Sequence, residues 1–244
     1  MIRMTYLLVA TLCYFAFFVS FVYLVGFLAG HPAMPTHVDK GMTASVPVAV
    51  FVNLGLIALF GLQHSVMARP GFKAAWTRIV PKPLERSVYC LATALVLAVF
   101  FAFWHQLPQV VWGVADPTGK AILWGLFLVG ILIVFISTWL LSHFELFGLA
   151  QAWSHFRGGE PGAPRFRTPL FYRMVRHPIY LGFFIALWAT PHMSLGHLIL
   201  SAGLTVYLLI GATFEERDLV DQFGTTYIEY QARVSMIVPG LGRK

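Results

Sequence analysis

The sequence predicts an all-α fold, a polytopic membrane helical bundle of about five to six transmembrane helices with both termini on the inner side. Three observations predict it. Of the 244 residues, 58% are hydrophobic and only 11% are charged, which exceeds what the core of a water-soluble protein of this size needs. Several apolar runs reach the roughly 20 residues that a membrane span requires. The basic residues are concentrated in alternate loops.

Four apolar runs in the first part of the chain are long enough to cross a bilayer. We expect helices there, because backbone groups in lipid must be hydrogen-bonded within their own segment. The first run, of about 25 residues, is longer than the roughly 7–15 residues of a signal-peptide core and is expected to be a retained anchor. The four runs lie at about residues 4–29, 46–67, 84–106 and 121–141.

A helical hairpin is predicted further along. The run from Ile179 to Thr190 has only about 12 residues, too few to span alone, and Pro191 interrupts it before a second run over 195–214. The count is therefore six spans, one of them atypical. Beyond the hairpin the helix should continue to Gly224, after which Thr225 is expected to cap a short amphipathic helix on the membrane surface.

The chain is expected to form a single integral-membrane domain over 1–244. Within it we distinguish a four-helix part, 1–141, an irregular cytoplasmic loop, 142–177, and a hairpin with its tail, 178–244. Cys13 and Cys90 both fall inside predicted spans, so the sequence offers no disulfide framework and favours buried thiols.

The distribution of charge sets the expected orientation. With the N-terminus inside, 15 of the 17 Lys and Arg residues lie on the inner side, and only Lys40 and Lys120 lie outside. This is the positive-inside pattern. The net charge of +7 is explained by topology and by attraction to anionic membrane lipid, so no nucleic acid partner is implied.

Ionisable side chains from four separate segments are predicted to meet at the inner ends of the helices. Polar groups at this depth are costly and usually functional, and convergence of distant segments is typical of a site. They are His64 at the end of the second span, His143 and Glu145 after the fourth, Arg176 and His177 before the hairpin, and Glu215 and Glu216 after it.

Each of these residues also has a structural explanation. His64 can be explained equally well as a histidine of the core and as a catalytic group. Asn53 lies on the same helix face and either extends a polar seam or makes one interhelical hydrogen bond, which is the simpler explanation. His143 and Glu145 are two residues apart and can share a site only if the helix ends there, as Gly148 indicates.

The acidic pair is equally open. Glu215 and Glu216 either extend into water and pair with Arg217 or Arg233, or accept hydrogen bonds from a ligand.

The C-terminal motifs resemble those of a known family. The run from Arg176 to Gly182 (RHPIYLG), the Glu215-Glu216 pair and the closing Val238-Pro239-Gly240 are similar to the signature of the integral-membrane methyltransferases, the isoprenylcysteine carboxyl methyltransferase and NnrU-like group. The resemblance implies that hairpin and tail enclose S-adenosylmethionine. The residues it places around this cofactor are Arg176, His177, Pro178, Tyr180, Glu215, Glu216, Tyr227 and Tyr230.

The N-terminal half resembles one branch of this group. Segments 63–70 and 142–149 look like those of bacterial enzymes that methylate methanethiol, whereas the usual Gly-Pro-Tyr upstream of the hairpin is replaced by Thr168 to Tyr172. The resemblance implies a small apolar thiol as substrate, dimethyl sulfide as product, and an active site on the cytoplasmic side of the bacterial inner membrane. It says nothing of the oligomeric state.

The chemistry requires a base, because a thiol must lose its proton before it attacks the methyl group. We expect His64 to be that base, with His143 as the second candidate and Glu145 orienting whichever histidine acts. The same three residues could hold a metal ion, but base catalysis without a metal is favoured.

Two other functions stay open. A related enzyme could methylate a larger lipophilic thiol, amine or carboxyl group. A non-enzymatic haem- or quinone-binding protein could use His64 and His143 as ligands.

Overall fold

The computed structural model describes residues 1–159 and 166–241. These divide into two compact units that interleave along the chain. Unit 1 contains Met1–Gln109, residues 142–159 and Ser194–Leu200, and unit 2 contains Val110–Leu141, residues 166–193 and residues 201–241.

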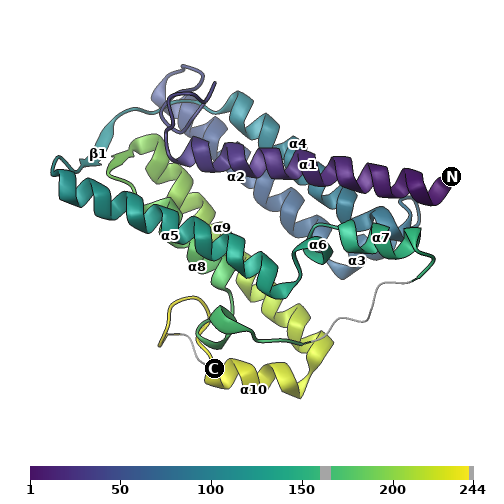
Figure 1. Cartoon of the computed structure of the whole chain (residues 1–244). Coiled ribbons are helices and arrows are strands. Elements are labelled where there is room, and N and C mark those ends of the chain that lie inside the picture. The colour runs from purple at the N-terminus through teal and green to yellow at the C-terminus, as the bar shows by residue number, and fades with distance from the viewer. Residues whose placement is uncertain (160–165, 242–244) are drawn as a thin grey trace. The chain divides into compact units, whose positions relative to one another are not determined.

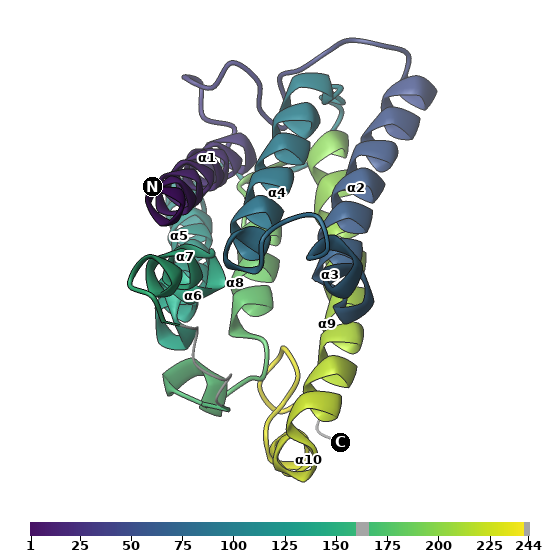
Figure 2. The same cartoon turned by 90° about the vertical axis from the view of Figure 1, so that its right-hand side faces the viewer.

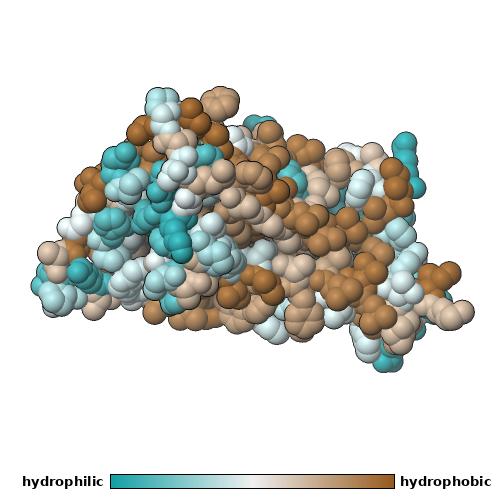
Figure 3. All heavy atoms as spheres, turned by 90° about the horizontal axis from the view of Figure 1, so that it is seen from above, coloured by the Kyte–Doolittle hydropathy of each residue, from teal (hydrophilic) through white to brown (hydrophobic). Residues whose placement is uncertain are grey.

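Unit 1 is built on three long helices, of which the second in chain order runs antiparallel to the other two. They are α1 (Ile2–Leu28), α2 (Val46–Ala68) and α4 (Glu85–Phe103), the last preceded by a 3-10 turn at Lys82–Leu84. Helix α4 packs against both α1 and α2 and lies between them (Figure 2). Many large apolar side chains of α1 are exposed, including Leu12 and Val19. Such exposure is tolerated because the surrounding solvent of a membrane helix is lipid. Figure 3 shows this apolar surface in brown.

Short helices near the ends of the long helices complete unit 1. Arg69 is extended, as residues before proline are, and α3 (Pro70–Trp76) follows it. Helices α6 (His143–Leu146) and α7 (Leu149–Phe156) are joined through Gly148, whose φ of 89° is left-handed. Helix α7 packs on α1 (Figure 1). The expected irregular loop over 142–177 is therefore partly helical, while its stretch 160–165 lies outside the described residues.

Unit 2 centres on two tightly packed helices, α5 (Pro117–Leu141) and α8 (Pro178–Trp188). A Cβ atom on Gly130 would lie 2.6 Å from the carbonyl oxygen of Gly182, and one on Gly182 would lie 2.6 Å from that of Gly130. Such small residues let two membrane helices approach with their backbones nearly in contact. The close packing of α8 on α5 thus depends on glycine at both positions.

The predicted hairpin is present. Helix α9 (Leu195–Phe223) runs back along α8, because Ser201 donates to the carbonyl of Leu187 at 2.7 Å and the Trp188 indole donates to the Thr205 hydroxyl at 3.0 Å. The turn between the helices contains a feature that the sequence did not predict. Strand β2 (His192–Ser194) pairs there with β1 (Val110–Gly113).

Among the described residues, five helices are long and apolar enough to cross a membrane: α1, α2, α4 with its preceding turn, α5 and α9. This confirms the predicted helical membrane fold and the four N-terminal runs. Helix α8 has 11 residues and is short, as expected. Cys13 and Cys90 are buried free thiols.

The tail follows the prediction except at its cap. Helix α10 (Thr225–Arg233) begins after Gly224, but Thr225 lies inside the helix and Gly224 is the N-cap, with no side-chain cap bond. The expected Thr225 cap is therefore wrong. Gly224 has a φ of 56°, so the chain turns through a conformation that glycine adopts without steric cost.

Candidate active site

A buried ion pair joins the two arms of the hairpin in unit 2. Arg176 lies just before α8 and Glu216 lies near the end of α9, and the Arg176 Nε donates to Glu216 Oε1. Their side chains are 0% and 2% exposed. Glu216 therefore pairs across the hairpin with Arg176, a partner that neither of the two alternatives for the acidic pair had named. A buried pair of this kind depends on both partners, because either charge alone would be uncompensated.

The same ion pair holds the C-terminal tail. Arg176 Nη1 donates to the carbonyl oxygens of Gln231, at 3.1 Å, and Val234. The Gln231 side chain in turn donates to Glu216 Oε2 at 3.0 Å, and the backbone N–H of Arg176 donates to the Ser235 carbonyl at 2.8 Å. The tail after α9 is thus fixed against the start of α8.

His177 lies between the two carboxylates. Its Nε2 is 3.3 Å from Glu216 Oε1 and its Nδ1 is 3.6 Å from Glu215 Oε2. The Tyr180 ring stacks on the imidazole, with centroids 5.1 Å apart, and the Tyr180 hydroxyl donates to Glu215 Oε2 at 2.7 Å. Glu215 is 45% exposed, so one acid is locked inside the cluster while the other faces outward.

Two buried donors in this cluster have no hydrogen-bond partner within the described part of the chain. They are Arg176 Nη2 and the Tyr227 hydroxyl. Their residues are 3% and 2% exposed. Burial raises the pKa of Tyr227 and raises that of Tyr230 to about 12, so both hydroxyls keep their protons. Unsatisfied buried donors are rare and indicate a missing acceptor.

The Tyr230 hydroxyl donates to the Tyr172 carbonyl. Pro178, another expected cofactor residue, is buried and begins α8. Phe166 packs its ring on Tyr230 at 5.3 Å and on Tyr227 at 5.9 Å.

In unit 1, His64 lies near the C-terminal end of α2, against α4. Its ring stacks on Phe60, with centroids 5.4 Å apart, and packs on Tyr89 at 5.0 Å. Its Nδ1 is 3.3 Å from the Thr93 hydroxyl. Asn53, on the same helix, exchanges two hydrogen bonds with the backbone of His105, at 2.8 and 2.9 Å. This confirms the simpler reading of Asn53 as a structural hydrogen-bonding residue.

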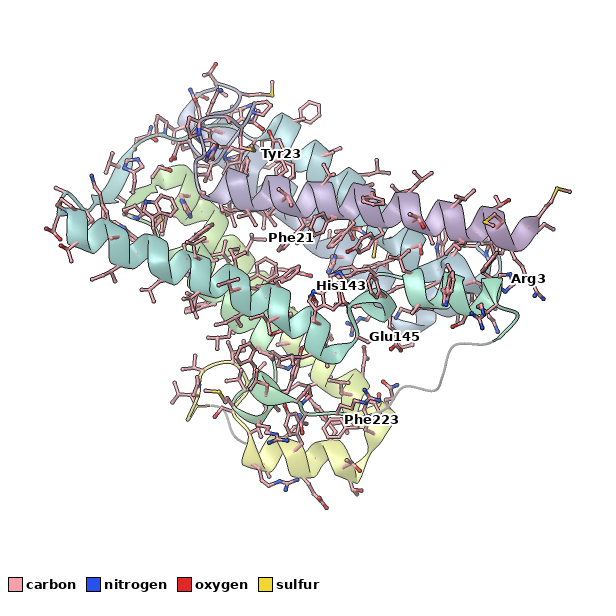
Figure 4. All side chains as sticks on the ribbon, in the orientation of Figure 1. Arg3, Phe21, Tyr23, His143, Glu145 and Phe223 are labelled. Atoms are coloured by element: carbon pink, nitrogen blue, oxygen red, sulfur yellow. The ribbon has the colours of Figure 1, made fainter. Side chains whose placement is uncertain are left out.

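His143 is the other buried histidine of interest in unit 1. Its Nε2 is 2.8 Å from the Tyr14 hydroxyl of α1, and the rings of Phe144 and Phe147 pack on it at 5.5 and 4.8 Å. Burial lowers the pKa of His143. Figure 4 shows His143 directed toward α1, whereas the exposed Glu145 lies on the other side of α6. The two side chains therefore occupy different environments, although helix α6 does end at Leu146, just before Gly148.

The predicted site residues thus fall into two groups. His64, His143 and Glu145 belong to unit 1, and the residues of the hairpin base belong to unit 2. Their convergence on one ligand stays a prediction. Within the described ranges, no three His, Cys, Asp or Glu side chains are grouped so that they could hold a metal ion.

Sequence reasoning missed several residues that contact the predicted ones, among them Tyr14, Thr93, Gln231 and Phe166. A hydroxyl inside an apolar span is the available signal for Tyr14 and Thr93, since such groups need a partner in lipid. Gln231 and Phe166 carry no signal of their own, because surface helices and loops commonly contain both residue types.

The fold and its clusters define a class, a multi-pass helical membrane protein with polar networks at the helix ends. The profile of the NnrU protein family matches residues 52–240. The chain belongs to this family. No solved structure shows significant similarity to it.

Named relatives extend the match over almost the whole chain. Methanethiol S-methyltransferase 1 of Bradyrhizobium diazoefficiens is 49% identical over 226 residues, 93% of this chain and 79% of that protein. The methanethiol S-methyltransferase of Mycobacterium tuberculosis is 46% identical over 93% of this chain and 92% of its own. Human Nurim is 33% identical over 68% of this chain and 66% of its own.

Proposed function

We propose that the protein transfers a methyl group from S-adenosylmethionine to methanethiol, giving dimethyl sulfide and S-adenosylhomocysteine. The observation that carries the proposal is the similarity to proteins named methanethiol S-methyltransferase, at 46–49% identity over 93% of the chain. Identity of this level over the full span of the helices supports a common reaction, and the hairpin cluster supplies the groups that the methyl donor needs.

The donors of the hairpin base fit the amino-acid end of S-adenosylmethionine. Its carboxylate is an acceptor with two oxygens, and Arg176 Nη2 and the Tyr227 hydroxyl are buried donors that lack one. Charge-assisted hydrogen bonds to a carboxylate are among the strongest in proteins. Glu215, exposed and held by Tyr180, offers an anion for the ammonium group or an acceptor for the ribose hydroxyls. Glu216 keeps Arg176 in place and so acts through it.

The bound donor supplies an electrophilic methyl group on a sulfonium sulfur. The chain must then hold the thiol in line, exclude water and accept its proton. His64 and His143 are the candidate proton acceptors, since an imidazole titrates near neutral pH. The Phe144 and Phe147 rings beside His143 form apolar surroundings suited to a methylthio group. Glu145 is left as a weaker candidate because it is exposed.

The positive-inside pattern of the sequence supports a cytoplasmic location for the proposed site. We assign the protein to the bacterial inner membrane on this basis. The protein is then surrounded by membrane lipid. The thiol is small and apolar, so it can reach the site from the membrane or from water.

The test uses the purified full chain in detergent with S-adenosylmethionine bearing a deuterated methyl group. Headspace mass spectrometry should detect labelled dimethyl sulfide from methanethiol and much less product from butanethiol. Separate His64→Ala and His143→Ala variants assign the base, with His31→Ala as the matched control, because His31 lies in an exposed loop. Absence of labelled dimethyl sulfide from an intact wild-type protein that binds S-adenosylhomocysteine would refute the thiol assignment. Equal use of long thiols would favour the larger lipophilic substrates.

A further inference from the structure

The hydrogen bonds of Thr93 determine which nitrogen of His64 carries a proton. Thr93, on α4, is 2% exposed. Its hydroxyl donates to the Tyr89 carbonyl at 3.0 Å and also lies 3.3 Å from His64 Nδ1. A hydroxyl has one hydrogen and two lone pairs. Because the hydrogen is used on the carbonyl, the hydroxyl can only accept from the imidazole.

It follows that His64 Nδ1 is the protonated nitrogen and that Nε2 carries the basic lone pair. A threonine that donates to the carbonyl four residues back is common in membrane helices and needs no functional explanation. That explanation does not account for the contact between the Thr93 hydroxyl and His64. Tyr89 contributes further to the arrangement, because its ring packs on the imidazole and its hydroxyl donates to the His64 carbonyl at 3.3 Å. The cation at this point is Arg86, whose guanidinium lies over the Tyr89 ring at 5.1 Å.

We propose that Thr93 is a positioning residue for the reaction, which fixes the Nδ1–H tautomer of His64 so that Nε2 takes the proton of the thiol. The inference rests on the proposed function. In the step, the S–H bond breaks and the proton moves to Nε2. The sulfur electron pair then forms the new C–S bond while the bond between the methyl carbon and the sulfonium sulfur breaks, and its electrons stay on S-adenosylhomocysteine. The proton on His64 leaves to solvent.

The arrangement suits proton uptake because it need not change during the step. The Nδ1–H donates to Thr93 whether the ring is neutral or charged, and hydrogen bonds from a charged donor are stronger.

The experiment compares Thr93→Val, which keeps the shape and removes the hydroxyl, with Thr93→Ser, which keeps the hydroxyl. Thr11→Val is the matched control, because Thr11 also donates to the carbonyl four residues back inside a span, at 2.8 Å. We expect kcat with methanethiol at neutral pH to fall by about tenfold to a hundredfold in Thr93→Val. Thr93→Ser should restore most of it, and KM for S-adenosylmethionine should stay unchanged.

The pH profile separates positioning from structural damage. From about pH 7 to about pH 9.5 a growing fraction of thiol ionises in solution, so the deficit of Thr93→Val should shrink as pH rises. A constant deficit at every pH, an equal loss in Thr93→Ser, or wild-type kcat in Thr93→Val would overturn the inference. The proposed function fails separately, when wild-type protein makes no dimethyl sulfide.

A measurement on the unmodified protein covers the case in which Thr93→Val does not fold. With ¹⁵N-labelled histidine, the nitrogen shifts distinguish the two neutral tautomers, and the His64 signals are assigned by their loss in His64→Gln. We expect a protonated Nδ1 and an unprotonated Nε2 at neutral pH. The opposite tautomer would refute the assignment.

Discussion

Replacing Glu216 by Ala is expected to destabilise the protein strongly, because it leaves the Arg176 guanidinium buried without a counter-ion. Both side chains are almost fully buried, at 0% and 2% exposure, so solvent cannot compensate the charge that is left. Breaking a buried pair by removing one partner typically costs about 3–5 kcal/mol. Gln231 also loses the carboxylate oxygen to which it donates. For a chain of this size the apparent Tm should fall by roughly 6–20 °C.

The assay is thermal unfolding of the purified protein in one detergent, followed by the fluorescence of its tryptophans. Glu215→Ala is the matched control, since Glu215 is the neighbouring acid but is 45% exposed, and an exposed pair is worth about 0–1 kcal/mol. The double variant Arg176→Met with Glu216→Met removes both charges and should cost less than Glu216→Ala alone. If Glu216→Ala and Glu215→Ala lowered Tm equally, the argument from the buried charge would be refuted.

Three further outcomes are expected. Tyr227→Phe should weaken S-adenosylhomocysteine binding about fivefold to tenfold in calorimetry, the value of one hydrogen bond, while Tm stays unchanged because that hydroxyl has no partner among the described residues; unchanged affinity would remove Tyr227 from the site. Gly182→Leu should lower Tm by several degrees and reduce expression, since its Cβ would lie 2.6 Å from the Gly130 carbonyl, whereas Gly55→Leu, in open surroundings, serves as the tolerant control. Burial lowers the pKa of His143 in the folded protein. As pH falls below about 6.5 the unfolded chain therefore binds a proton first, and stability declines until pH reaches the lower pKa of the folded state. The fall in Tm between pH 7.5 and pH 5.5 should be smaller in His143→Gln than in the wild type, and an equal fall would exclude this histidine as the cause.

The membrane helices could be predicted from sequence because lipid allows few alternatives. A long apolar run has to be helical, and the counts of Lys and Arg then orient the whole chain. The hairpin was predictable for the same reason, since a run of about 12 residues followed by Pro191 cannot span. The pairing of β1 with β2 was not, because segments of 4 and 3 residues are too short to show a periodicity.

The sequence predicted which residues belong to the polar network, but it did not predict which of them pair with one another. Arg176, His177 and Glu216 stood out because charged residues near hydrocarbon are unusual. Their partners depend on which helix faces bring them together, and Glu216 pairs with Arg176, a residue 40 positions away in the chain. Tyr14 and Thr93 were missed because a single hydroxyl in a span is as often satisfied by its own helix as by a histidine.

The acceptors of Arg176 impose an order on biosynthesis. Two of them are the carbonyls of Gln231 and Val234, which come after α9 has ended at Phe223. Both arms of the hairpin are therefore synthesised before the guanidinium can obtain its full set of partners. A chain that stopped before Gln231 would lack these two acceptors and would leave the cation of Arg176 only partly satisfied.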